Sequence, residues 1–179
     1  MARTNRSPSP GTVLDVTTTL QRLGLAPDTR AVVIACDGLG SSNAANLSIY
    51  EALRQGVATT AGLQVPSPWA RGAVSEFQGE DIGVSLTLNS EHDRYRWGPI
   101  THGPSLLDGD GGFPRTLDDL WDHADVEEAR RECRAQIERA VMWGFDVSVT
   151  YPSLSPRGLW ETAWPKYFPI AQKTVLSSC

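Results

Sequence analysis

Short aliphatic runs recur along the chain and alternate with longer segments in which apolar residues fall at helical spacing. Runs rich in aliphatic and β-branched residues, bounded by glycine, proline or aspartate, are typical of buried strands. On this pattern we expect strands at residues 30–36, 57–65, 81–88 and 145–151.

The longer segments have the spacing of amphipathic helices. We expect helices at residues 12–24, 43–56 and 125–144, and a turn with a short helix at 66–77. The segment 125–144 is the clearest, because Asp125 is a good N-terminal cap and acidic residues fill the first turn. Its buried stripe is predicted to contain Ala129, Cys133, Ile137, Ala140 and Val141.

Strands that alternate with helices favour an α/β fold with a parallel sheet, which is either open or closed into a barrel. In both forms, binding and catalytic groups gather at the carboxyl ends of the strands. We therefore expect Asp37, residues 87–91 and residues 151–155 at one rim. An irregular insert at 89–122 leaves this rim, and its length and aromatic content favour a functional loop.

The chain has 179 residues, enough for one domain with a hydrophobic core, which we expect at residues 12–179. Residues 1–11 contain serine and proline but no apolar stretch, which predicts a disordered tail rather than a signal peptide. The net charge of −5 argues against nucleic acid as a partner, and no apolar run is long enough to span a membrane. Three scattered cysteines favour a reduced, cytoplasmic protein.

The run AVVIACDGLGSS at residues 31–42 ends its aliphatic part with a carboxylate, Asp37, followed by Gly38. A carboxylate at a strand tip can accept a proton or a hydrogen bond from a ligand. Cys36 is interpreted as a small core residue, because no histidine adjacent in sequence would activate it as a nucleophile.

Stretches spread over residues 18–150 carry a family resemblance. They include LQRLGLAPDTRAVVIACDGLG, NSEHDRYRWGPITHGPSLLDGDGGFPRTLDDLW and RAQIERAVMWGFDVS. In this order they resemble the YdjC-like carbohydrate deacetylases of the ChbG and HpnK type. The resemblance implies an irregular, TIM-like (β/α) barrel. It also implies hydrolysis of the N-acetyl group of a sugar, with a divalent metal such as zinc or magnesium as the family cofactor.

The resemblance also assigns roles to individual positions. The first family motif carries two aspartates, a general base and a metal ligand, and these positions fall on Asp37 and Gly38. The two histidine ligands of the family fall on Ser85, in GVSLTL, and on Ser153, in VTYPS. All three metal-ligand positions are then substituted. Since a catalytic metal needs about three protein ligands, we expect no metal cofactor.

The sequence thus predicts a homologue that no longer deacetylates. We expect it to bind a sugar-like small molecule, or to use Asp37 as a base in a metal-independent reaction, and whether it is an enzyme stays open. One alternative is an active deacetylase with a displaced metal site built from Asp37, His92 and His102. The other is a non-catalytic protein that forms a dimer or is an evolutionary remnant.

Residues beyond Asp37 are candidates for binding such a ligand. Strand alternation places residues 85, 87, 89 and 91 on one side, where polar groups suit a sugar or polyol, although they also fit a merely polar strand end. Arg96 can hold a carboxylate or phosphate, or pack within a lid, and both interpretations stay open. The predicted ligand-binding residues are Ser85, Thr87, Glu91, Arg96, Trp97 and Ser153.

The length of the chain bears on the expected barrel. An eight-unit barrel needs about 250 residues, so we expect a partial barrel that lacks its C-terminal units. A barrel that is not closed exposes a strand edge, which invites pairing with a second chain. A homodimer through this edge is therefore an expected partner, alongside a sugar-like small molecule.

Overall fold

The computed structural model describes residues 21, 24–26, 28–147 and 149–152, and the chain divides into two units, Met1–Val32 and Val33–Cys179. In the first unit the described residues form short turns, one of them closed by the Thr29 amide donating to the Ala26 carbonyl. The expected tail at 1–11, most of the expected helix at 12–24, and Ser153 lie outside the described residues.

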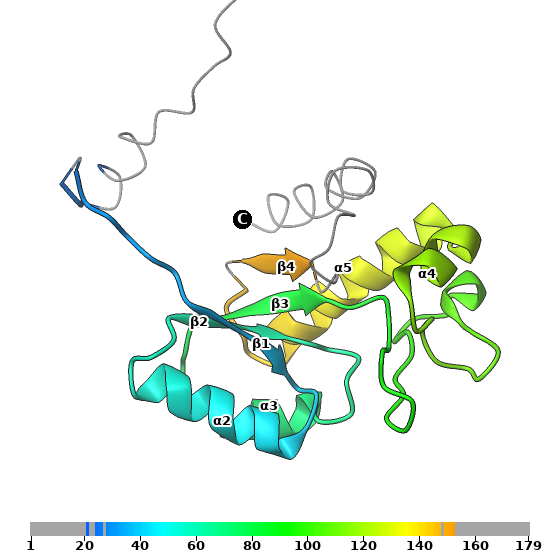
Figure 1. The fold of residues 1–179 in the computed structure, drawn as a ribbon, viewed down its shortest axis with the longest axis horizontal. Helices are drawn as coiled ribbons and strands as arrows, with labels where there is room; N and C mark the ends of the chain where they lie inside the picture. Colours follow the sequence, from blue (N-terminus) through cyan, green and yellow to red (C-terminus); the bar gives the residue numbers. More distant parts are fainter. Residues whose placement is uncertain (1–20, 22–23, 27, 148, 153–179) are drawn as a thin grey trace, which may run out of the picture. The chain divides into compact units, whose positions relative to one another are not determined.

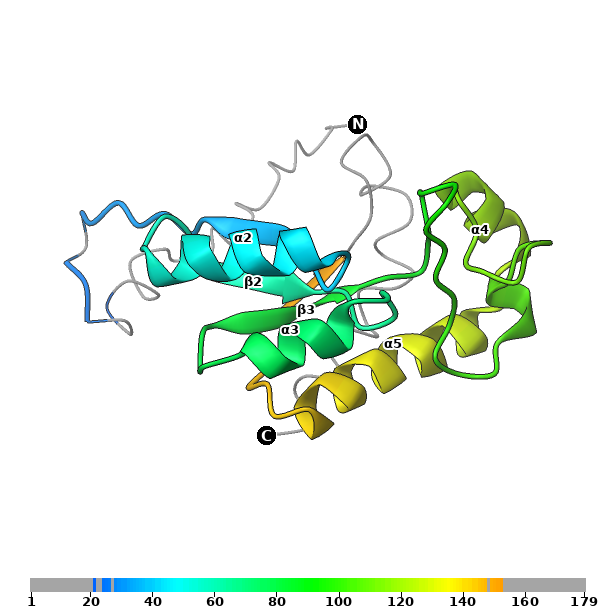
Figure 2. The ribbon, with the colours of Figure 1, turned by 90° about the horizontal axis from the view of Figure 1, so that it is seen from below.

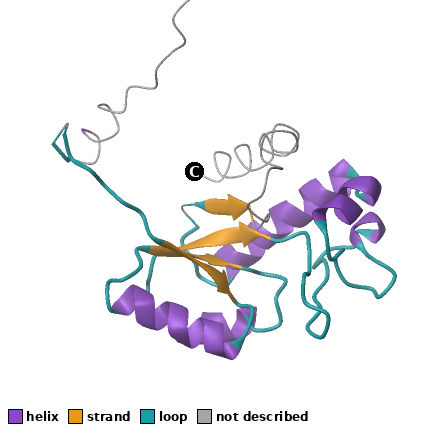
Figure 3. Ribbon diagram, in the orientation of Figure 1, coloured by secondary structure: helices purple, strands orange, loops and turns teal. Residues whose placement is uncertain are grey.

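The second unit is built on a parallel sheet with the strand order β1-β2-β3-β4 (Figures 1 and 3). The strands are β1 (Ala35–Leu39), β2 (Thr60–Leu63), β3 (Ile82–Leu86) and β4 (Thr150–Pro152). The predicted α/β fold with a parallel sheet is therefore confirmed. Within the described residues the sheet is open, so its closure into a barrel stays a prediction.

Helices pack against one side of this sheet (Figure 2). They are α2 (Asn43–Arg54), α3 (Ala70–Glu76) and α5 (Val126–Met142). The predicted helices at 43–56 and 125–144 are confirmed, and Asp125 is the N-terminal cap of α5 as expected. Their apolar side chains meet those of the strands in one core, which includes Leu39, Leu63, Val84, Ile49 and Ile137. No helix in the described part of the chain is long and apolar enough to cross a membrane.

The insert at 89–122 is more ordered than its sequence predicts. It contains a short 3-10 helix, η1 (Pro104–Leu106), and the helix α4 (Leu117–His123). Its apolar side chains form a second core with the first half of α5, which includes Trp97, Leu106, Phe113, Leu120 and Cys133. Burial raises the pKa of the Cys133 thiol to about 12, as expected for a core residue.

Two predicted strands lie elsewhere than expected. The strand predicted at 30–36 begins only at Ala35, and upstream of it Val33 and Ile34 are exposed. The strand predicted at 145–151 begins only at Thr150. The apolar residue Phe145 packs in the core instead of pairing in a strand, and its ring centroid lies 4.6 Å from that of Phe77. Apolar runs in this sequence therefore include core residues and exposed connecting residues as well as residues that pair in strands.

Candidate functional site

The candidate site lies where β1 and β3 approach their carboxyl ends. The Asp37 side chain is exposed, and its Oδ1 accepts a hydrogen bond from the Gly38 amide at 2.9 Å. The Ser85 hydroxyl donates to the same oxygen at 3.5 Å, and Ser85 is buried. Strand β2 lies between these strands, and its Gly62 carries no side chain. The structure therefore brings together Asp37 and Ser85, which the sequence predicted separately as a base and as a ligand-binding residue.

The loop after Asp37 is held by hydrogen bonds as well as by the packing of Leu39 in the core. Gly38 has a φ of 86°, a conformation that side-chain-bearing residues rarely adopt. The Ser41 hydroxyl donates to the Gly38 carbonyl at 2.6 Å, and the Gly40 amide donates to Asn46 Oδ1 at 2.7 Å. Asn46 Nδ2 in turn donates to the Trp69 carbonyl at 3.0 Å. The position of Asp37 is thus fixed from α2 and from the start of α3.

Sequence analysis did not identify Asn46 as part of this site. It is buried on the side of α2 that also carries Ile49 and Tyr50. A polar residue within an otherwise apolar helix stripe was the available signal, because a buried amide needs hydrogen-bond partners.

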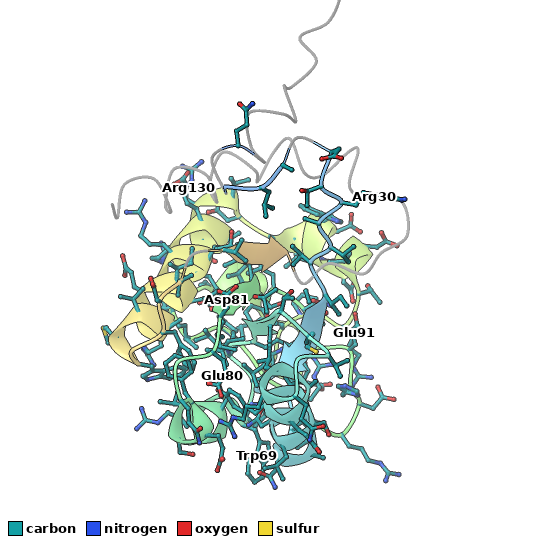
Figure 4. The ribbon with its side chains drawn as sticks, turned by 90° about the vertical axis from the view of Figure 1, so that its left-hand side faces the viewer. Arg30, Trp69, Glu80, Asp81, Glu91 and Arg130 are labelled. Carbon is teal, nitrogen blue, oxygen red and sulfur yellow. The ribbon has the colours of Figure 1, made fainter. Side chains whose placement is uncertain are left out.

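The predicted ligand-binding residues after β3 have different surroundings. Thr87 is buried, and its hydroxyl donates to the Ser85 carbonyl at 2.9 Å. Glu91 is exposed, as Figure 4 shows, and its Oε1 accepts from Asn89 Nδ2 at 3.1 Å. The carboxylate of Glu91 is therefore accessible to solvent, whereas the hydroxyl of Thr87 bonds the backbone of β3.

Arg96 and Trp97 contact the interior of the insert. Arg96 forms an ion pair with Asp108 and donates to the carbonyls of Ser90, at 3.3 Å, and Phe113, at 2.6 Å. Trp97 is buried, and its indole donates to the Asn89 carbonyl at 2.9 Å. Arg96 was expected either to hold a carboxylate or phosphate of a ligand or to pack within a lid. These contacts are those of a residue that packs within the insert.

Asp108 is suited to this ion pair. Burial raises the pKa of its carboxyl group, but hydrogen bonds from the amides of Asp110 and Gly112 and the charge of Arg96 bring the pKa below its ordinary value overall. The carboxylate therefore stays ionised at neutral pH and holds the Arg96 guanidinium.

The described residues do not form a site for a divalent metal. Among residues 28–147 and 149–152, no three His, Cys, Asp or Glu side chains converge in a way that could hold an ion. Asp37 has a serine hydroxyl and a glycine beside it, and a catalytic metal needs about three ligands of nitrogen, sulfur or carboxylate type. The displaced set of Asp37, His92 and His102 does not converge either.

Polar residues of α5 were also missed by sequence analysis. Glu128, Glu132 and Gln136 follow one another at four-residue spacing, and all three bond groups outside α5. Glu132 and Gln136 are fully buried beside the predicted apolar stripe, of which Val141 is exposed rather than buried. Their spacing was visible in the sequence, but their burial depends on the insert and on β3.

Comparisons with known proteins show the family of this chain. The family described as YdjC-like protein matches residues 31–148. A carbohydrate deacetylase from Thermus thermophilus is 42% identical over 121 residues, which cover 68% of this chain and 42% of that protein. A carbohydrate deacetylase from Brevibacillus brevis is 36% identical over 121 residues, covering 65% of this chain and 46% of that protein.

A solved structure shows the same fold. It is that of a proposed cellobiose-phosphate cleavage protein from Enterococcus faecalis V583, with a TM-score of 0.66 and 25% identity, covering 79% of this chain and 55% of that one. The chain thus spans about half the length of the proteins it matches.

The parallel sheet with a carboxylate near the end of β1 defines an α/β protein whose candidate site lies at its strand ends. The family match extends over most of the chain and includes the strands β1, β2 and β3. The chain belongs to the YdjC-like protein family, as its sequence motifs predict.

Proposed function

We propose that this YdjC-like chain binds a sugar-like ligand at the ends of β1 and β3 without a divalent metal and does not deacetylate it. The observation that carries the proposal is the pairing of an exposed Asp37 carboxylate with the Ser85 hydroxyl, 3.5 Å apart. Carboxylates and hydroxyls are the groups that hydrogen-bond the hydroxyls of a sugar.

In this proposal Asp37 is the acceptor for a ligand hydroxyl or the base of a metal-independent reaction. Among the described residues, only the Gly38 amide and the Ser85 hydroxyl bond its side chain, and both use Oδ1. The carboxylate therefore has acceptor capacity left for a ligand. The remaining proposed ligand-binding residues are Ser85, Thr87, Glu91, Arg96, Trp97 and Ser153, of which Arg96 and Trp97 would act by shaping the insert.

The residues at the family positions support a metal-free mechanism. A divalent metal lowers the pKa of bound water and polarises the amide carbonyl, and neither Gly38 nor Ser85 supplies a ligand of the kind it prefers. The alternative, an active deacetylase with a displaced metal site, is supported by the names of the relatives. The irregular barrel of the resemblance is likewise proposed, supported by the parallel sheet and its match to a longer chain.

The first test is metal content, measured by mass spectrometry on protein purified after supplementation with zinc and nickel. We expect no metal above background and no release of acetate from N,N′-diacetylchitobiose. Near-stoichiometric metal together with acetate release would replace this proposal by the displaced-site deacetylase.

The second test is ligand-induced thermal stabilisation with N-acetylglucosamine, diacetylchitobiose and cellobiose. A ligand at about a hundred times its Kd stabilises the folded state by about 2.7 kcal/mol, which raises the Tm by roughly 5–10 °C for a chain of this size. Asp37→Asn should abolish this shift. Asp146→Asn is the control, because the same change is made at an exposed position between α5 and β4. A shift equal in both variants would exclude Asp37 as the ligand anchor.

A second candidate function is self-association, and its observation is the exposed apolar surface beside β1. β1 is a terminal strand of the described sheet, and Val33, Ile34 and Val57 are all exposed. Ile34 lies beside Thr59, two residues after Val57, because the Thr59 amide donates to the Ile34 carbonyl at 2.9 Å. We propose that a second copy of the chain covers this edge.

A further inference from the structure

One side of α5 carries side chains that fasten two distant segments of the second unit. Glu132 and Gln136 are separated by one helical turn, have no exposed surface and bond each other, Gln136 Nε2 donating to Glu132 Oε1 at 2.9 Å. Neither is used by the proposed ligand chemistry, and each bonds backbone groups outside the helix.

Glu132 holds the insert. Its Oε1 accepts from the Ile100 amide at 3.1 Å, and its Oε2 accepts from the Thr101 amide at 2.9 Å and from the Thr101 hydroxyl at 2.6 Å. Within the described part of the chain, no Lys, Arg or His side chain forms an ion pair with Glu132. A buried carboxylate with neutral donors alone is costly unless its oxygens are well satisfied, which these donors achieve.

Gln136 holds the end of β3. Its Oε1 accepts from the Thr87 amide at 3.0 Å, and its Nε2 donates to the Thr87 carbonyl at 2.8 Å. The side-chain amide thus pairs with both backbone groups of one residue, as a neighbouring strand would. Thr87 in turn bonds the Ser85 carbonyl, and Ser85 bonds Asp37. A continuous chain of hydrogen bonds therefore runs from the insert through α5 to the candidate site.

We propose that Glu132 and Gln136 are positioning residues, which clamp the insert and the end of β3 in one fixed relation and so place Ser85 beside Asp37. Apolar residues of similar volume would stabilise a core at least as well as a buried charge. A carboxylate, however, can accept hydrogen bonds from two successive amides and a hydroxyl at the same time. The consequence for ligand binding rests on the proposed function, whereas the clamp itself does not.

The test is hydrogen exchange of individual amides by NMR in Glu132→Gln. The new amide nitrogen cannot accept the bonds made to the oxygen that it replaces, which is Oε1 for Ile100 and Oε2 for Thr101, so we expect exchange at Ile100 or Thr101 to be about tenfold faster than in the unmodified chain. Thr87 keeps its own acceptor, Gln136, in this variant. Faster exchange at Thr87 therefore reports loosening transmitted through α5, which a purely local loss would not produce.

Glu138→Gln is the matched control, because it removes the same charge from an exposed position of the same helix. Exchange at Thr87 that is equal in the two variants would overturn the clamp, and so would an equal acceleration of all slowly exchanging amides, including Leu63 in β2. Thr101→Val is a milder second variant that removes only the hydroxyl donor. In this variant, exchange should be faster at the amide of residue 101 and, to a smaller extent, at the amide of Thr87. No change at either amide would also overturn the proposal.

The affinity for diacetylchitobiose, measured by calorimetry, separates the clamp from the proposed function. Glu132→Gln should weaken binding about tenfold, with Glu138→Gln unchanged. An unmodified chain that binds no sugar would refute the proposed function, and the exchange data would still decide the clamp. Unchanged affinity in Glu132→Gln beside faster exchange at Thr87 would overturn the link from the clamp to the site.

Discussion

Gly40 shows how a single residue determines where Asp37 can lie. Its φ is 94°, and a Cβ built on it would lie 3.0 Å from the Gln64 carbonyl oxygen and 3.2 Å from the Ala70 Cα. Both neighbours are backbone atoms, which cannot move aside as the end of a flexible side chain would. The tight approach brings the Gly40 amide to Asn46, whose side chain ties α2 to the start of α3.

Gly40→Ala should therefore be strongly destabilising. We expect a loss of about 2–4 kcal/mol in the free energy of unfolding, from the left-handed conformation and the steric overlap together. Gly56→Ala is the control, because Gly56 has a φ of 77° but nothing within 4 Å of the added carbon. That variant should lose only about 1 kcal/mol. Urea unfolding measures both, and equal losses would show that the close approach has no energetic role.

At the scale of residues, the sequence predicts what depends on neighbours along the chain and misses what depends on distant partners. The aliphatic run before Asp37 is local, so Asp37 could be placed near the end of the first strand, although β1 continues beyond it to Leu39. The roles of Asn46 and Glu132 could not be predicted, because their partners lie 23 residues away at Trp69 and 31 residues away at Thr101. Arg96 was ambiguous for the same reason, since its acceptors come from three separate points of the insert.

The first turn of α5 is the element that joins the helix to the insert, and its contacts depend on pH. Asp125 caps the helix by accepting from the Glu127 and Glu128 amides, each at 3.0 Å. Glu128 accepts from the hydroxyl and the amide of Ser105 at 2.7 and 2.9 Å. These bonds from Ser105 hold the pKa of the Glu128 carboxyl group below its ordinary value of 4.5.

The sign of the pH dependence follows from this depressed pKa. A carboxylate whose pKa is lower in the folded chain contributes stability above its ordinary pKa, and this contribution is lost as the pH falls from 4.5 through the folded value. We expect the free energy of unfolding to fall less steeply below pH 4.5 in Glu128→Gln than in the unmodified chain. Urea unfolding between pH 7 and pH 3 tests this, with Glu138→Gln as the control that should follow the unmodified chain.

Element boundaries were predictable where the determining signals are local. The N-terminus of α5 was predictable, because a cap and an acidic first turn lie within a few residues of each other. The starts of β1 and β4 were not predictable, because a parallel strand begins where its neighbour becomes available for pairing. Ile34 illustrates this: its carbonyl bonds the Thr59 amide, but regular pairing begins at Ala35 with Thr60.

For the molecule as a whole, the unusual feature is the apolar surface at the β1 edge of the described sheet. Val33 is 74% exposed and Ile34 is 49% exposed, in a chain that spans about half the length of its relatives. β1 is a terminal strand of this sheet, and the exposed β-branched residues that directly precede it add apolar surface to a template for pairing with another strand. Because the same edge is present on every copy, two copies related by a two-fold axis can cover it reciprocally.

Val33→Lys should therefore reduce self-association. A lysine two residues before the edge strand β1 opposes pairing there, because its charge would have to be buried against the second copy. The control is Met142→Lys, which introduces the same charge at a residue that is 75% exposed at the end of α5. Sedimentation equilibrium should give a dimer for the unmodified chain and for Met142→Lys, with the dissociation constant of Val33→Lys raised about tenfold or more. The Tm of the unmodified chain should also rise with protein concentration, since a dimer stabilises the fold by mass action. A Tm independent of concentration, or equal dissociation constants in the two variants, would show that the β1 edge is not an interface between copies.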